Sequence, residues 1–152
     1  MKNLIFKKGA RAILLDSKGR VLLAKRAKGI ESGKWCLIGG KPEDNETMEE
    51  AVIREVKEEI AADVELSFYR KVGGFDETKN VRWLSSYFFG QLKSDNPPDK
   101  FDKNEISELR FFSANELEKL EIAFDHQQIL KDFFKDYSKV SSRETKKIIP
   151  SR

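Results

Sequence analysis

Residues 40–59, GKPEDNETMEEAVIREVKEE, contain the start signal and the apolar stripe of one amphipathic helix. Thr47 and Glu50 have the three-residue spacing of a capping box, in which each side chain satisfies a backbone N–H group at the helix start. Apolar side chains then recur at three- and four-residue intervals, at Met48, Val52, Ile53, Val56 and Ile60. We therefore predict a helix from Thr47 to about Ala61 that packs this stripe on the core.

Three carboxylates of the same helix, those of Glu55, Glu58 and Glu59, lie beside the apolar stripe. At 100° per residue, Glu55 and Glu59 are about 40° apart around the helix axis. Like charges this close repel each other, and more strongly where water is excluded. A bound divalent cation would remove this repulsion, and Mg²⁺ and Mn²⁺ prefer oxygen ligands. Taken alone, the cluster is equally compatible with a solvated, charged helix face.

The residues before the helix separate these two interpretations. Gly40, Glu46 and Arg54 precede Glu55 at the spacing Gly-x5-Glu-x7-Arg-Glu, and the two further glutamates follow. This stretch resembles the Nudix box, Gly-x5-Glu-x7-Arg-Glu-U-x-Glu-Glu-x-Gly-U, where U is a bulky aliphatic residue. At a residue frequency of about 6%, six fixed positions agree by chance roughly once in ten million registers.

The sequence departs from the family pattern at three positions. Ala61 stands where the family has glycine, Ala62 where it has a large aliphatic residue, and Ile38 where it usually has proline. Glycine after a helix favours the turn that leaves it. We therefore expect the departure at Ala61 to alter the helix exit more than the metal site.

The resemblance implies an α+β fold, a Nudix-like α/β/α sandwich with a mixed, curved sheet. It also implies a metal site, whose candidate ligands are Glu55, Glu58, Glu59, Gly39 through its carbonyl, and Glu105. Candidate catalytic residues are Glu55, Glu58 and Arg54. One of the two glutamates would be the general base, and Arg54 would orient the carboxylates together with Glu46.

The implied function is metal-dependent hydrolysis of a pyrophosphate bond, with water attacking phosphorus. The substrate would be a nucleoside diphosphate derivative, either ADP-ribose-like or a nucleoside triphosphate, and the cofactor Mg²⁺ or alternatively Mn²⁺. Residues 123–126 resemble the corresponding stretch of the ADP-ribose pyrophosphatase-like branch. The alternative from another functional class is a non-catalytic, Nudix-derived module that binds or senses a nucleotide.

Candidate substrate contacts lie outside the helix. Lys25 and Arg26, at the end of a predicted strand, could contact phosphates, and a solvated strand end is the alternative. Phe75 and Trp83 could form a wall on which a base stacks, although aromatic residues in strands are more often core. Gly40 belongs to a break where the backbone can approach a ligand closely.

The flanking sequence predicts further elements. We expect strands at 10–15, 20–25, 35–38, 64–72, 81–92 and 106–112, a loop at 73–80, and a final helix after Asp125. His126 is expected to cap or pack that helix. These elements make one domain, residues 1–137, and the basic residues 138–152 make a tail.

Composition limits the class of protein. The 152 residues carry a net charge of +3, and no apolar run approaches the roughly 20 residues of a membrane span. Cys36 is the only cysteine, so an intrachain disulfide is excluded and a core position is expected. We predict a cytoplasmic location, a nucleotide-type small-molecule partner, no membrane, and no nucleic acid except as a capped-RNA substrate. The sequence leaves a homodimer and a monomer open.

Overall fold

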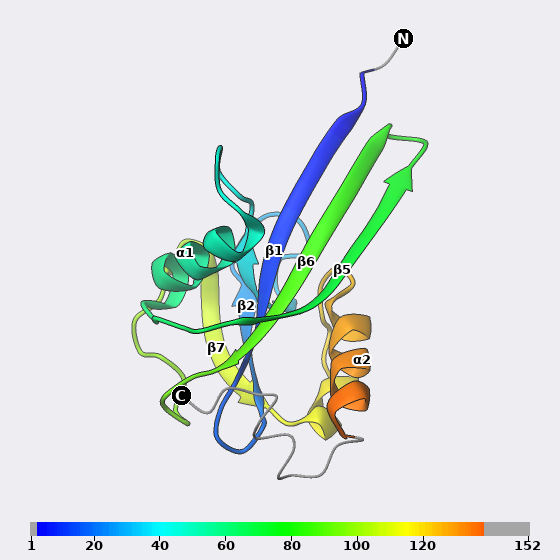
Figure 1. The fold of residues 1–152 in the computed structure, drawn as a ribbon. Coiled ribbons are helices and arrows are strands. Elements are labelled where there is room, and N and C mark those ends of the chain that lie inside the picture. The colour runs from blue at the N-terminus through cyan, green and yellow to red at the C-terminus, as the bar shows by residue number, and fades with distance from the viewer. Residues whose placement is uncertain (1–2, 139–152) are drawn as a thin grey trace.

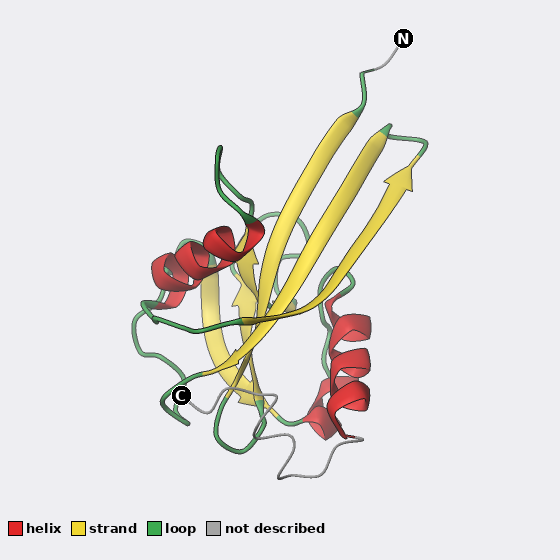
Figure 2. Cartoon of the chain, viewed as in Figure 1, coloured by secondary structure: helices red, strands yellow, loops and turns green. Residues whose placement is uncertain are grey.

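The computed structural model describes residues 3–138, and its helices cover the two faces of one sheet (Figures 1 and 2). In chain order, the elements are β1 (Ile5–Leu15), β2 (Val21–Arg26), β3 (Trp35–Cys36), β4 (Ile38–Gly40), α1 (Met48–Ile60), β5 (Ser67–Asp76), β6 (Val81–Gln91), β7 (Ile106–Phe112), the 3-10 helix η1 (Ala114–Lys119) and α2 (His126–Ser138). The predicted tail lies outside the described residues, except that α2 includes Ser138.

The sheet is mixed, as predicted. Its strands follow the order β3-β2-β1-β6-β5, while β4 pairs with β1 and β7 pairs with β2. Among the ladders within residues 3–138, only β1–β6 is parallel, and it runs the full length of both strands. The helix–sheet–helix arrangement confirms the expected α+β sandwich.

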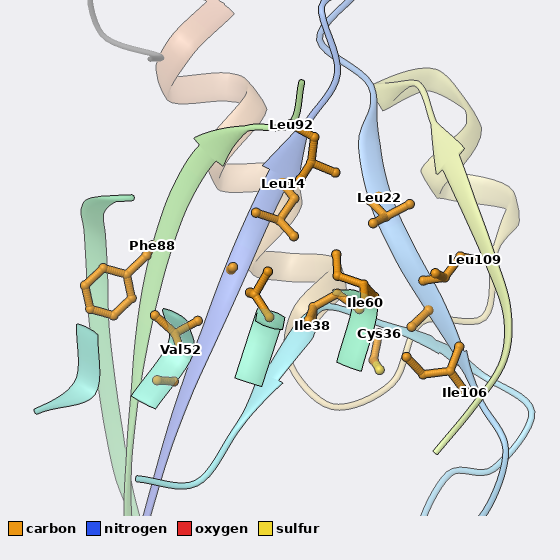
Figure 3. Close-up of a cluster of buried hydrophobic side chains, with 14 of the residues drawn as sticks. Leu14, Leu22, Cys36, Ile38, Val52, Ile60, Phe88, Leu92, Ile106 and Leu109 are labelled. Carbon is orange, nitrogen blue, oxygen red and sulfur yellow. The ribbon is translucent and has the colours of Figure 1, made fainter. Parts of the chain in front are cut away.

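Helix α1 follows the sequence prediction closely. The Thr47 hydroxyl accepts from the Glu50 N–H at 3.1 Å, and the Glu50 carboxylate accepts from the Thr47 N–H at 2.9 Å. The helix ends at Ala61, which adopts a left-handed conformation with φ 54° and donates its N–H to the Lys57 carbonyl. Val52, Val56 and Ile60 of the apolar stripe are buried in one cluster with residues of β1, β2, β4 and β7 (Figure 3), whereas Ile53, which the sequence analysis placed on the core, is 36% exposed.

Helix α2 covers the opposite face. Leu130 and Phe133 are fully buried against β1 and β2 residues such as Ile13 and Leu23. Arg70 on β5 forms an ion pair with Asp132 at 2.7 Å, which ties the edge of the sheet to this helix. Neither helix in the described part of the chain is both long and apolar enough to cross a membrane.

Strands β1, β6 and β5 continue beyond the rest of the sheet as a three-stranded arm (Figure 1). The arm was not predicted, because β1 starts five residues earlier than expected and β5 extends to Asp76, four residues into the predicted loop at 73–80, of which residues 77–80 form a turn. Gly74 allows this continuation: a Cβ atom there would lie 2.6 Å from the Trp83 ring on β6. Glycine at this position marks close approach within a strand rather than a turn.

Candidate active site

Arg54 organises the carboxylates on α1. Its guanidinium makes two hydrogen bonds to Glu46, Nε to Oε2 at 2.6 Å and Nη2 to Oε1 at 2.9 Å. Nη1 donates to Glu55 at 2.7 Å and to Glu58 at 2.9 Å, and Nη2 donates to the Lys41 carbonyl at 3.0 Å. Such charge-assisted, partly bidentate bonds fix the orientation of each carboxylate. Arg54 therefore has the positioning contacts expected from the sequence.

Strand β4 brings its glycines against this cluster. A Cβ atom on Gly40 would lie 2.5 Å from Glu55 Oε2, so only glycine leaves room for the carboxylate in this position. Gly39 has φ 153°, and a Cβ atom there would lie 2.1 Å from the Ala10 carbonyl oxygen on β1. The predicted break at these residues is thus a short strand squeezed between β1 and α1.

Glu59 is the most unusual carboxylate of the cluster. Its Oε1 accepts from the Gly39 N–H at 3.3 Å. Burial, followed by the nearby negative charge of Glu55, raises the pKa of Glu59 to about 7, and the charge of Glu105 acts in the same direction. Burial also raises the pKa of Glu55. Both carboxyl groups therefore take up a proton more readily than an ordinary exposed glutamate.

The donor chemistry here fits a hard divalent cation. Carboxylate oxygens of Glu55 and Glu59 lie beside the peptide groups of Gly39 and Gly40, and oxygen donors of this kind suit Mg²⁺. Within residues 3–138, no three His, Cys, Asp or Glu side chains are already arranged to hold an ion. Arg54 donates hydrogen bonds to Glu55 and Glu58, so these two carboxylates would have to reorient to bind the same cation. The ligand set stays a prediction.

Glu105 lies next to this cluster but has a cationic partner of its own. Its carboxylate is 3.4 Å from Lys28 Nζ, and both side chains are exposed. Its negative charge nevertheless contributes to the raised pKa of Glu59. The structure thus brings Glu105 to the rim of the site and leaves its predicted role as a ligand open.

Arg11 is a site residue that the sequence analysis missed. It projects from β1 and donates Nη1 to the Leu37 carbonyl at 3.0 Å. Its positive charge lowers the pKa values of both Glu55 and Glu59, although burial still dominates each shift. The signal in the sequence was a single arginine within the otherwise apolar stretch 10–15.

Phe124, at the turn before α2, lies under two guanidinium groups. Those of Arg26 and Arg11 are 4.8 and 5.8 Å from the ring centroid. Phe124 has φ 55°, and its N–H donates to Glu31 at 2.8 Å. By contrast, Lys25 lies over Trp35, at 5.8 Å. The structure therefore brings Arg26, but not Lys25, to the Phe124 side of the site.

His126 is buried and structural. Its Nδ1 accepts from the Leu37 N–H at 3.1 Å, and its ring meets Tyr87 edge to face. Burial, then the charges of Arg11 and Arg26, holds its pKa well below the usual value. The packing role predicted for His126 is confirmed, and so is the core position of Cys36.

A groove of about 280 Å³ opens beside Gly40, between β1, β6 and the turn before α2. Aromatic side chains on its walls belong to Trp83, Tyr87 and Phe124, and Arg11, whose charge acts on Glu55 and Glu59, lines it as well. Of the two aromatic residues predicted to stack on a base, Trp83 lines this groove. Phe75 does not; it lies on β5 under the Arg82 guanidinium, 5.4 Å away.

This site agrees with a known family. A model of the NUDIX domain matches residues 6–133. The chain belongs to the NUDIX family. An ADP-ribose pyrophosphatase of Methanocaldococcus jannaschii is 32% identical over 128 residues, which are 80% of this chain and 70% of that protein. An 8-oxo-dGTP diphosphatase of Proteus vulgaris is 45% identical over 56 residues, 36% of this chain and 50% of that protein. The prediction of a Nudix hydrolase is confirmed.

Solved structures of Nudix proteins share the fold. A MutT NUDIX hydrolase from Burkholderia pseudomallei has a TM-score of 0.71 and 26% identity, over 83% of this chain and 96% of that one. The NUDIX domain of Shewanella oneidensis NrtR, solved with ADP ribose, has a TM-score of 0.70 over 90% of each chain. At 18% identity, this second likeness concerns the fold alone.

Proposed function

We propose that this Nudix hydrolase cuts the pyrophosphate bond of a nucleoside diphosphate derivative, ADP-ribose-like or a nucleoside triphosphate, with Mg²⁺ or Mn²⁺ as cofactor. One observation carries the proposal. Glu55, held by Arg54, lies against Gly40, Glu59 lies against Gly39, and Gly40 also lines a groove with aromatic walls. Carboxylates next to a groove with aromatic walls match the two halves of a nucleotide.

In this proposal, Glu55, Glu58 and Glu59 hold the cation, with the Gly39 carbonyl and Glu105 beside them. A divalent cation, when bound, neutralises phosphoryl oxygens and lowers the pKa of water. Glu55 or Glu58 takes the proton from the attacking water, a contribution of about 10² to 10⁴ in rate. Arg54 keeps both carboxylates in position through its contacts with Glu46 and with the glutamates themselves.

The remaining groups bind the substrate. Arg11 and Arg26 present guanidinium groups beside Phe124, and guanidinium forks suit phosphate oxygens. Trp83 supplies an aromatic surface for the base, and Gly40 allows a close approach of the backbone. A relative that matches over 70% of its own length is an ADP-ribose pyrophosphatase, which favours ADP-ribose as the first substrate to test.

The test is product release from ADP-ribose, common and oxidised nucleoside triphosphates, nucleotide sugars and capped RNA, with Mg²⁺, with Mn²⁺ and with chelator. We expect turnover that chelator abolishes. Glu55→Gln and Glu58→Gln should each lower kcat at least a hundredfold in a folded protein. Glu49→Gln is the matched control, because Glu49 lies in the first turn of the same helix.

Two outcomes would contradict the proposal. Near wild-type turnover in both Glu55→Gln and Glu58→Gln would remove these residues from catalysis. Nucleotide binding without turnover of any substrate would favour the regulatory module instead.

A further inference from the structure

A second groove continues from the active site along β1. It measures about 470 Å³ and is lined by Phe6, Lys7, Lys8, Lys41 and Pro42. Three of these residues, Lys7, Lys8 and Lys41, also line the active-site groove. The two grooves are therefore contiguous, and together they lead from Gly40, which packs against Glu55, to Phe6 on β1.

The charge of this path is one-sided. Lys7, Lys8, Lys41 and Arg11 contribute four cations, and none of the described residues that line the two grooves is acidic. The whole chain, with 29 basic and 26 acidic residues, is nearly balanced, so the positive charge is local. The loop after Pro42 carries Glu43, Asp44 and Glu46, but none of them lines either groove, and Glu43 and Glu46 both pair with Arg54. A groove of one charge attracts a polyanion.

An exposed aromatic ring accompanies the cations. Half of the Phe6 surface is exposed, and Lys8 Nζ lies 5.4 Å from its ring centroid. Pro42 lines the same groove. Cations that follow a backbone, with rings on which bases stack, are the combination that binds single-stranded nucleic acid without sequence preference.

The length and the edge of β1 fit the same ligand. From Arg11 to Phe6 the strand rises about 17 Å, the length of roughly five stacked nucleotides of a single strand. Along Ile5–Gly9, β1 pairs with β6 on one side, and no strand among residues 3–138 pairs with its other edge. A second copy pairing there would bring the lysines of both copies together, which like-charge repulsion opposes.

We propose that the β1 groove binds a short single strand of phosphodiester-linked nucleotides that extends the substrate beyond its first nucleoside. This inference rests on the proposed function, because the hydrolysed bond is the pyrophosphate at the 5′ end of that strand. Lys7, Lys8 and Lys41 contact successive phosphates, and Phe6 stacks on a base.

The test compares two substrates with the same first nucleoside, a nucleoside triphosphate and a 5′-triphosphorylated oligoribonucleotide of five residues. The readout is the ratio of kcat/KM for the oligonucleotide to kcat/KM for the mononucleotide. We expect Lys7→Ala/Lys8→Ala to lower this ratio at least tenfold. Lys71→Ala/Lys79→Ala, which removes the same charge from the β5 side of the arm, should leave it within twofold. An equal ratio in the two double variants would overturn the proposal.

A binding measurement separates this proposal from the proposed function. The binding of a fluorescent 5′-triphosphorylated oligonucleotide is measured at several salt concentrations on Glu58→Gln protein, with and without Lys7→Ala/Lys8→Ala. We expect the slope of log K against log salt concentration to be smaller in magnitude by about 1.4 when the two lysines are removed, because two phosphate contacts are lost. If this change is observed while no substrate is hydrolysed by the wild-type protein, strand binding by the groove is supported and the proposed hydrolysis is overturned. If mononucleotides are hydrolysed while the oligonucleotide does not bind, the proposed hydrolysis is supported and strand binding by the groove is overturned. Equal competition by inorganic polyphosphate, with no effect of Phe6→Ala, would overturn the role of the bases.

Discussion

Gly40 packs directly against the carboxylate of Glu55, and an added Cβ atom would lie 2.5 Å from Glu55 Oε2. The backbone of Gly40 does not adopt a positive φ, so the conformation does not require glycine. The reason for glycine here is the space that the Glu55 carboxylate needs. Gly40→Ala should therefore displace Glu55 while leaving the fold intact.

We expect Gly40→Ala to lower kcat/KM about 10- to 100-fold, because a displacement of about 1 Å can cost 10² in rate. Steady-state kinetics and circular dichroism would measure activity and folding together. Gly9→Ala is the control: its Cβ atom would meet the Gly40 carbonyl oxygen at an ordinary 3.9 Å, so its loss should be much smaller. Full activity in folded Gly40→Ala would show that Glu55 does not need its present position.

Ala61 takes a left-handed conformation, φ 54° and ψ 34°, where the family pattern has glycine. The departure at this position leaves the helix exit in the geometry that glycine prefers, so the expected change of exit is not seen. An alanine in this region is strained by roughly 1 kcal/mol. Ala61→Gly should thus raise the free energy of unfolding by about 0.5 to 1 kcal/mol in denaturant titrations. Ala62→Gly, at a residue without positive φ, should give no gain; equal effects of the two substitutions would contradict the strain argument.

Local signals and tertiary contacts explain which features the sequence could predict. The capping box of Thr47 and Glu50 and the spacing of the box glutamates are local, so α1 and its carboxylates could be placed in advance. The role of Gly74 depends on the Trp83 ring across the ladder, so this glycine was taken for part of a loop. Arg11 and Phe124 meet only after the chain folds, because 113 positions separate them, and no local pattern marks the contact.

The raised pKa of Glu59 predicts a pH dependence of stability. Its folded value, about 7, exceeds the ordinary 4.5, so the folded state binds more protons than the unfolded state between these two pH values. The free energy of unfolding of the metal-free protein should therefore fall as pH rises from 4.5 to 7, by up to roughly 3 kcal/mol from this group. Glu59→Gln should remove that part of the decrease.

The proposed role of Glu59 as a metal ligand predicts a link between protons and metal binding. A cation held by the Glu59 carboxylate would displace the proton, so Mg²⁺ affinity should rise with pH up to about 7 and then level off. Calorimetry in buffers of different ionisation enthalpy would measure the protons released at pH 6. Proton release of the same size from Glu59→Gln would assign the titration to another group.

The charge of Arg11 opposes the effect of burial on the pKa values of Glu55 and Glu59. Arg11 lowers the pKa values of Glu55 and Glu59, while its Nη1 donates to the Leu37 carbonyl. Removing the charge in Arg11→Met should raise the pKa of Glu59 above about 7, measured by ¹³C NMR of the carboxyl carbon in metal-free protein. Arg11→Lys keeps the charge, so its shift should be smaller, although both variants lose the guanidinium geometry at Leu37 and should be destabilised by about 1 to 3 kcal/mol. Because both variants lose the guanidinium, a shift shared equally by them would assign the effect to packing rather than to charge.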